Sequence, residues 1–175
     1  HEVLSRAAPS IVGRSSVIRN GLVPPTLAPT PLPFDPPHLV SLGRLIERKG
    51  LDVLLLAFAR LRLQHPHVRL TIAGDGPDRI ALEQQSIALG LGDAVQFIGW
   101  VEREAVPALF NSATMLVLPS RAEGFRIVAL EAAQMARPVV ASAVEFVLDG
   151  LHLSKRLNKV AAGGRAEYQS LRPRR

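Results

Sequence analysis

From residue 38 to residue 141 the sequence alternates short, almost wholly apolar runs with longer stretches that carry apolar residues at helical spacing. The apolar runs predict strands near residues 38–42, 68–73, 95–98, 114–118 and 138–141. The longer stretches predict helices near residues 51–63, 78–89, 103–112 and 125–136. Such alternation indicates a parallel sheet with right-handed crossovers, and continuous apolar strands indicate that helices cover both faces. The sequence therefore predicts a doubly wound α/β fold.

The loops with distinctive residues all follow predicted strands. Gly43, Gly74, Gly99 and residues 120–124 each come directly after an apolar run. The carboxyl ends of parallel strands meet at one edge of a sheet, and ligands of such folds bind outside that edge. We therefore expect one site there, although a turn such as Gly74–Pro77 also occurs without any ligand.

Two carboxylates, Glu123 and Glu131, flank the start of the helix predicted at residues 125–136. At a rise of ~1.5 Å per residue, eight positions would separate them by roughly 12 Å along the helix axis. They would then hold two ends of one elongated ligand, whereas the two carboxylates of a glycosidase lie about 5 to 9.5 Å apart across a single bond. The spacing therefore argues against hydrolysis of that kind. The alternative is a pair of solvated glutamates, the commoner state of charged residues.

A positively charged loop joins the first predicted strand to the first predicted helix and contains Arg44 and Lys49. Because a helix N-terminus offers unpaired N–H groups and roughly half a positive charge, this loop could hold a diphosphate. It is not a Walker loop, and it contains no Gly-x-Gly-x-x-Gly of the dinucleotide-binding type. Taken alone, two such cations are more often ordinary surface charges, and Gly43 a plain turn residue.

A series of short motifs extends from residue 17 to residue 142: Val17–Gly21, Gly43–Leu45 with Lys49–Gly50, Gly74–Pro77, Phe97–Gly99, Leu118–Ser120, Glu123–Phe125 with Glu131, and Arg137–Ser142. In this order and at these separations, the motifs resemble the C-terminal, donor-binding domain of the retaining GT-B glycosyltransferases of the group 1 type, glycosyltransferase family 4. The resemblance implies a Rossmann-like sheet that is one half of a two-domain architecture. It also implies transfer of a hexosyl group from a UDP- or GDP-sugar to an acceptor, with retention of configuration.

The resemblance further implies roles for individual residues. Arg44 and Lys49 would stabilise the departing diphosphate and Glu123 would hold hydroxyls of the transferred sugar, so these three are the candidate catalytic residues. Glu131 would take both ribose hydroxyls. No metal or other cofactor is expected, because protein cations and a helix dipole replace magnesium in this family. The full candidate set for binding the nucleotide-sugar is Gly43, Arg44, Lys49, Glu123, Gly124, Phe125, Ile127, Val128 and Glu131.

The domain organisation predicted from composition has four parts. Residues 1–23 are a remnant or inter-domain segment, and residues 24–37, with seven of the fourteen prolines, are a linker. Residues 38–150 form the nucleotide-sugar-binding domain, which is expected to be incomplete because the family's Gly-Gly-x-Pro loop does not follow Val144. Arg126 is a separate departure, since it stands where the family commonly has a glycine. Since the chain begins with His1 rather than methionine, we expect a fragment that lacks the N-terminal acceptor domain and is inactive by itself.

Residues 151–175 hold seven Lys or Arg and one Glu, and so carry the whole net charge of +6. We expect a disordered or degenerate tail and no stable complex with nucleic acid; binding of nucleic acid through this tail is the alternative. A non-catalytic nucleotide-binding or interaction module is a further alternative function for the whole chain.

The composition also restricts the class of protein. With no cysteine, the chain cannot form disulfides or thiolate metal sites, and no apolar run approaches the ~20 residues that cross a membrane. We therefore expect a cytoplasmic protein. Peripheral contact of the basic tail with the inner face of a membrane is compatible with this expectation.

Overall fold

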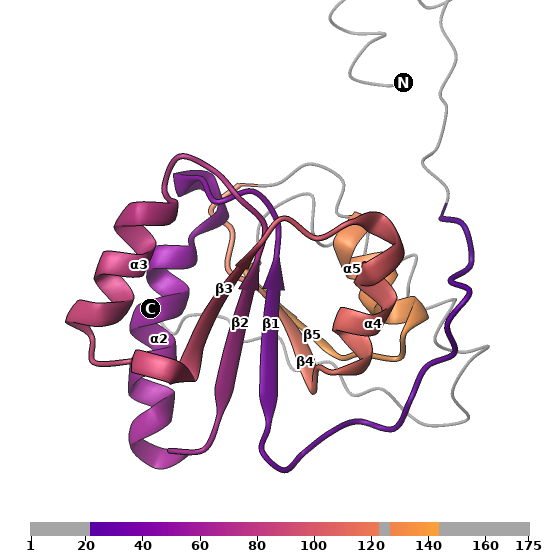
Figure 1. Ribbon diagram of the computed structural model, residues 1–175, viewed down its shortest axis with the longest axis horizontal. Coiled ribbons are helices and arrows are strands. Elements are labelled where there is room, and N and C mark those ends of the chain that lie inside the picture. The colour runs from indigo at the N-terminus through magenta and orange to yellow at the C-terminus, as the bar shows by residue number, and fades with distance from the viewer. Residues whose placement is uncertain (1–21, 123–126, 144–175) are drawn as a thin grey trace, which may run out of the picture.

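The computed structural model describes residues 22–122 and 127–143. Within them the chain forms a five-stranded sheet in the order β3-β2-β1-β4-β5, in which every neighbouring pair is parallel (Figure 1). This is the doubly wound α/β fold that the alternating pattern predicts. The strands are β1 (His38–Leu42), β2 (Arg69–Ala73), β3 (Val95–Gly99), β4 (Met115–Leu118) and β5 (Val139–Ala141).

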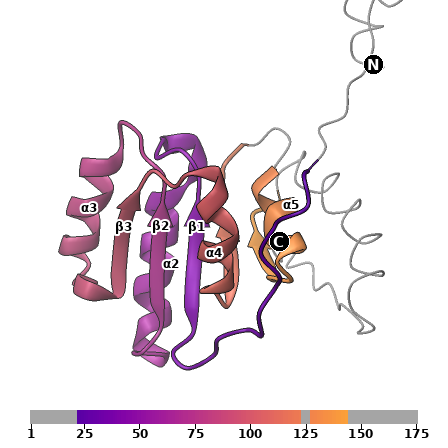
Figure 2. The ribbon, with the colours of Figure 1, turned by 45° about the vertical axis from the view of Figure 1, so that its right-hand side comes forward.

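The described residues include four α-helices, which lie in two layers, one on each side of the sheet. Figures 1 and 2 show α2 and α3 on one face and α4 and α5 on the other. The predicted helix at residues 103–112 is divided into a 3-10 turn and a short α-helix, with Pro107 in the first turn of the latter, where its missing N–H costs nothing. The helices are α2 (Leu51–Gln64), α3 (Arg79–Ala88), α4 (Val106–Asn111) and α5 (Ile127–Gln134), and the 3-10 turns are η2 (Glu47–Lys49), η3 (Gly92–Ala94) and η4 (Arg103–Ala105).

Each helical layer packs on the sheet through its own apolar core. On one face, α2 buries Leu51, Leu54, Leu55 and Phe58, which share one side of a helix because they lie three and four residues apart. On the other face, Phe110 of α4 is fully buried. Each such side chain contributes about 1.5–3 kcal/mol of transfer free energy, so the two cores fix the helices and, with them, the loops at both sheet edges.

The proline-rich segment before β1 runs over the surface of α4 and is fastened there by hydrogen bonds. Asn111, at the end of α4, accepts a hydrogen bond from the Thr30 N–H at 3.0 Å and donates one to the Ala28 carbonyl at 2.9 Å. The buried guanidinium of Arg137 donates to the Thr30 carbonyl at 2.8 Å. The described part of the predicted linker is therefore attached to the domain, with one isolated bridge between Phe34 and Pro37 as its regular structure.

Candidate functional site

The sheet order creates a crevice between β1 and β4. The chain leaves β1 toward β2 and β3 on one side, and then crosses to β4 and β5 on the other side. The connections after β1 and β4 therefore depart over opposite faces of the sheet, and the space between them is where doubly wound folds bind ligands. The glycines after β1, β2 and β3 and the described start of the loop after β4 lie at this edge.

A pocket of about 190 Å³ occupies this crevice. Its floor consists of the ends of β1, β2 and β4, at Leu42, Ala73 and Leu118. The loop after β1, the start of α2, the loop after β4 and the start of α5 form its walls. The wall residues are Gly43, Arg44, Lys49, Leu51, Pro119, Ser120, Ile127 and Val128.

Gly50 allows the two principal loops to touch. It lies at the junction of η2 and α2 in the left-handed region, with φ 65°. A Cβ at this position would lie 2.2 Å from the carbonyl oxygen of Pro119, in the loop after β4. Only glycine combines this backbone conformation with this approach, so Gly50 keeps the pocket narrow.

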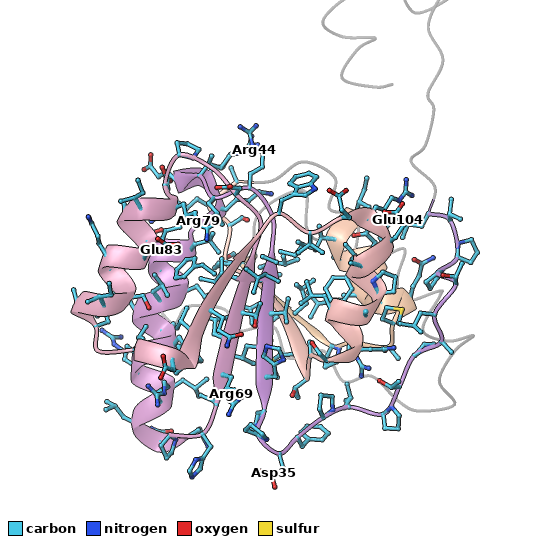
Figure 3. All side chains as sticks on the ribbon, viewed as in Figure 1. Asp35, Arg44, Arg69, Arg79, Glu83 and Glu104 are labelled. Atoms are coloured by element: carbon cyan, nitrogen blue, oxygen red, sulfur yellow. The ribbon has the colours of Figure 1, made fainter. Side chains whose placement is uncertain are left out.

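The pocket is positively charged. Arg44 is exposed at its rim and projects from the edge where the strands end (Figure 3). Lys49 is partly buried, and its Cε lies 3.7 Å from the position that a Cβ on Gly43 would occupy, so its chain runs beside the first loop. Among the described residues that line the pocket there is no carboxylate. Two cations in one pocket attract an anion.

Glu131 lies one turn beyond the part of α5 that lines this pocket. Glu131 lines a neighbouring pocket of about 250 Å³, which lies between α5, the region of η4 and α4, and residues 22–26. Burial raises the pKa of the Glu131 carboxyl, and the charge of Arg103 on η4 partly offsets this effect. Near an apolar wall and one cation, this carboxylate can replace bound water with hydrogen bonds from hydroxyl groups at little cost in free energy.

The structure brings together five of the nine candidate residues. Gly43, Arg44, Lys49, Ile127 and Val128 surround one pocket, whereas Glu131 lines the next one. One helical turn of about 5.4 Å separates the two pockets along α5, so a single ligand must be elongated to reach both. The remaining candidates, Glu123, Gly124 and Phe125, lie outside the described residues.

The comparison with protein families decides what kind of domain carries this site. The sequence model of the family described as "Glycosyl transferases group 1" matches residues 27–153. The chain belongs to this family. The Rossmann-like fold, one half of a GT-B architecture, agrees with that membership: the solved apo structure of the lipopolysaccharide outer core galactosyltransferase WaaB is similar, with a TM-score of 0.61, 28% sequence identity, and coverage of 74% of this chain and 37% of that one.

Curated relatives of the chain come from different organisms. The chain is 37% identical over 133 residues to the phosphatidylinositol N-acetylglucosaminyltransferase gpi3 subunit of Schizosaccharomyces pombe, which covers 75% of this chain and 29% of the relative. It is 38% identical over 127 residues to the GDP-mannose-dependent alpha-(1-6)-phosphatidylinositol monomannoside mannosyltransferase of Mycolicibacterium smegmatis. This match covers 66% of this chain and 33% of the relative. The chain thus spans about a third of the length of these proteins.

Sequence reasoning missed one pair of residues beside the pocket. Arg121, directly after the Pro119–Ser120 wall, forms a bidentate ion pair with Asp52 in the first turn of α2, at 2.6 and 2.7 Å. The two residues are 69 positions apart in the sequence. Because no short motif connects residues at that separation, the pair becomes visible only once β1 and β4 are known to be neighbours.

The described residues show neither a metal cluster nor a membrane helix. In residues 22–122 and 127–143, no three His, Asp or Glu side chains are grouped so that they could hold a metal ion. In the same part of the chain, no helix has the length and the apolar character needed to cross a membrane. The predicted basic tail at residues 151–175 and the predicted domain end at residue 150 lie outside the described residues.

Proposed function

We propose that this chain is the donor-binding half of a glycosyltransferase that moves a hexosyl group from a UDP- or GDP-sugar to an acceptor with retention of configuration. The observation that carries the proposal is the pocket between β1 and β4, which Arg44, Lys49 and the starts of α2 and α5 line at the carboxyl edge of the sheet. Family membership supplies the reaction class, and the pocket supplies a place for the donor diphosphate.

In this proposal Arg44 and Lys49 act on the leaving group. As the bond between the sugar and the diphosphate breaks, negative charge accumulates on the phosphate oxygens that depart. Cations held at that place stabilise the transition state more than the ground state, which is what lowers the barrier. The N–H groups at the starts of α2 and α5 add to the positive potential, because Leu51, Ile127 and Val128 all line the pocket.

Glu131 is proposed to bind the ribose. With the diphosphate between the loops after β1 and β4, the nucleoside would extend along α5 into the neighbouring pocket, where Glu131 and Arg103 face each other. The offset of about one helical turn suits a ribose attached to a diphosphate. An ionised carboxylate accepts hydrogen bonds from both ribose hydroxyls at once.

The part of the site that would hold the transferred sugar is proposed from the family resemblance alone. Glu123 is proposed to bind sugar hydroxyls, and the backbone N–H groups of Gly124 and Phe125 to surround the sugar and phosphates. The protein cations and helix ends neutralise the diphosphate in this scheme, so we propose that the reaction uses no bound metal and no other cofactor.

The isolated chain is proposed to bind the donor without transferring sugar. Transfer in a GT-B architecture occurs between two domains, and the partner would be an N-terminal acceptor domain. The chain matches about a third of its curated relatives, which supports the assignment to one half of such a protein. Detectable transfer by the purified 175-residue chain would contradict this part of the proposal.

Calorimetric titration of UDP and GDP tests the diphosphate site. The variants Lys49→Ala and Arg44→Ala should each weaken binding about 10- to 100-fold, since hydrogen bonds to charged groups contribute about 1.5–3 kcal/mol. Arg69→Ala is the matched control, because Arg69 is exposed at the opposite edge of the sheet, at the start of β2 (Figure 3). The proposal is wrong if the wild-type chain binds neither nucleotide at millimolar concentration, or if Arg69→Ala weakens binding as much as Lys49→Ala.

A further inference from the structure

Arg121 joins the two loops that form the walls of the pocket. Its guanidinium spans from the loop after β4 to the start of α2, where Nη1 and Nη2 donate to the two oxygens of Asp52 at 2.7 and 2.6 Å. Nη1 also donates to the carbonyl of Glu47 in η2 at 2.6 Å. A planar guanidinium that meets a carboxylate with two parallel hydrogen bonds fixes orientation as well as distance.

The main chain also joins the loop after β4 to η2. The Arg121 N–H donates to the Arg48 carbonyl at 2.9 Å. Next to it, Gly50 approaches the Pro119 carbonyl so closely that no side chain fits between them. A backbone hydrogen bond, backbone packing and an ion pair therefore hold the same two loops together across the crevice between β1 and β4.

All of these contacts converge on the short turn that presents Lys49. η2 comprises Glu47, Arg48 and Lys49, and Arg121 engages the carbonyls of the first two. The Glu47 carbonyl also accepts the Gly50 N–H at 3.0 Å, which closes the turn immediately after Lys49. With its first two carbonyls bound from outside, the turn cannot rotate without breaking contacts to Arg121.

We propose that Arg121 is a positioning residue for Lys49: by fastening η2 and the first turn of α2 to the loop after β4, it holds the Lys49 ammonium at the pocket. The inference rests on the proposed function, because it assigns Arg121 a part in binding the donor diphosphate. Arg121 itself is not among the residues that line the pocket, so it acts through Lys49 rather than on the ligand.

An ordinary surface ion pair would behave differently. The Arg121 and Asp52 side chains are about two-fifths exposed, and such pairs contribute little to global stability. Arg79 and Glu83 offer a matched comparison: their ion pair, at 2.9 Å and of similar exposure, joins two residues within one helix, α3. The Asp52–Arg121 pair instead joins the first turn of α2 to the loop after β4, which lie 69 positions apart in the sequence. Its loss should therefore change the geometry of the pocket more than the stability of the fold.

Backbone amide hydrogen exchange of the ligand-free chain tests whether Arg121 holds η2 against the loop after β4. In Arg121→Gln, the backbone N–H groups at positions 121 and 50 should exchange at least about 10-fold faster, because local opening governs their protection. Asp52→Asn should produce the same change to a smaller extent, and Arg79→Gln should leave both groups unchanged. Unaltered exchange at positions 121 and 50 in Arg121→Gln, with the sheet intact, would overturn the proposal. If Arg121→Gln does not fold, Asp52→Asn decides the question by the same measurement.

A double-mutant cycle on UDP affinity tests the link to Lys49. Arg121→Gln should weaken UDP binding about 5- to 10-fold in the wild-type background and hardly at all when Lys49 is already replaced by alanine. A general loosening of the domain would instead reduce affinity equally in both backgrounds, which would overturn the positioning role. If the wild-type chain binds no nucleotide but the exchange result holds, the proposed donor site fails while the fastening of η2 by Arg121 stands.

Discussion

Gly74 lies directly against Gly43 where β1 and β2 end, so closely that a Cβ added to Gly74 would lie 1.9 Å from the Gly43 carbonyl oxygen. The two strands pair in register up to Leu42 and Ala73, and the Gly43 N–H donates to the Ala73 carbonyl at 3.0 Å. Gly74 also adopts φ 123°, which L side chains rarely adopt. The glycine after β2 therefore supports the loop that carries Arg44, and its role is explained by contact with the main chain.

Gly74→Ala should destabilise the domain by more than about 3 kcal/mol, because a methyl group would displace the backbone of the first pocket loop. Gly90→Ala is the matched control, since Gly90 has φ 66° but no atom within 4 Å of its Cβ position. The control should lose only about 1–2 kcal/mol from left-handed strain. Urea unfolding followed by circular dichroism measures both values. Equal losses in the two variants would show that the contact with Gly43 contributes nothing.

Arg137→Met should destabilise the domain by about 2–4 kcal/mol, because it removes the buried guanidinium that joins α4 to the segment before β1 through hydrogen bonds to the Phe110 and Thr30 carbonyls. Arg137 is 3% exposed, and its guanidinium donates to the carbonyls of Phe110 and Thr30 at 2.7 and 2.8 Å. Burial also lowers the pKa of Arg137. The measurement is the midpoint of urea unfolding.

Limited proteolysis gives a second measurement for Arg137→Met. Residues 28–30 should become accessible to protease, because Thr30 and Asn111 lose the guanidinium that joins them. Arg69→Met is the control, as Arg69 is exposed at the start of β2. A variant with unchanged stability and unchanged cleavage would show that Asn111 alone fastens this segment.

The sequence was sufficient to predict the sheet and the edge that carries the site. Apolar runs locate strands to within a residue, and a parallel topology brings the ends of these strands together, which is why the loops that begin at Gly43 and Ser120 were expected in one place. Ile127 and Val128 were expected there from the family resemblance. Contacts that depend on tertiary pairing could not be predicted. Arg121 meets Asp52 across 69 positions and Arg137 meets Thr30 across 107, and no local pattern encodes either pair.

Glu131 was expected to hold one end of an elongated ligand, at the ribose. The rotation of α5 directs its side chain into the neighbouring pocket, where the charge of Arg103 acts on its carboxyl. Sequence spacing along a helix gives the distance between residues. It does not give the direction in which the helix presents them until the packing against η4 and α4 is known.

Asp52→Asn should lower stability at neutral pH by less than about 1 kcal/mol, since the ion pair is partly exposed. The hydrogen bond from Arg121 lowers the pKa of the Asp52 carboxyl in the folded chain. A carboxyl whose pKa is lower in the folded chain than in the unfolded chain stabilises the fold at pH values above its unfolded pKa of about 4. This contribution to the free energy of unfolding is lost as pH falls through the folded pKa. The difference between wild type and variant should thus be constant near neutral pH and vanish in acid. Urea unfolding from pH 7 downward measures it, and a difference that grows in acid would contradict the assignment.

Glu131→Gln should raise stability at pH 7 and weaken UDP binding at the same pH. Burial raises the pKa of Glu131, so the folded chain opposes ionisation of this carboxyl. The wild type therefore loses stability as pH rises from the unfolded pKa of Glu131 through its folded pKa, whereas the amide variant does not. If the carboxylate accepts both ribose hydroxyls, wild-type affinity should fall as pH decreases through this raised pKa, whereas the affinity of the variant should stay flat. Calorimetry between pH 5 and pH 8, beside urea unfolding, separates the two effects. A residue with only a structural role would change stability and affinity in the same direction, while a binding residue held in an unfavourable environment changes them in opposite directions.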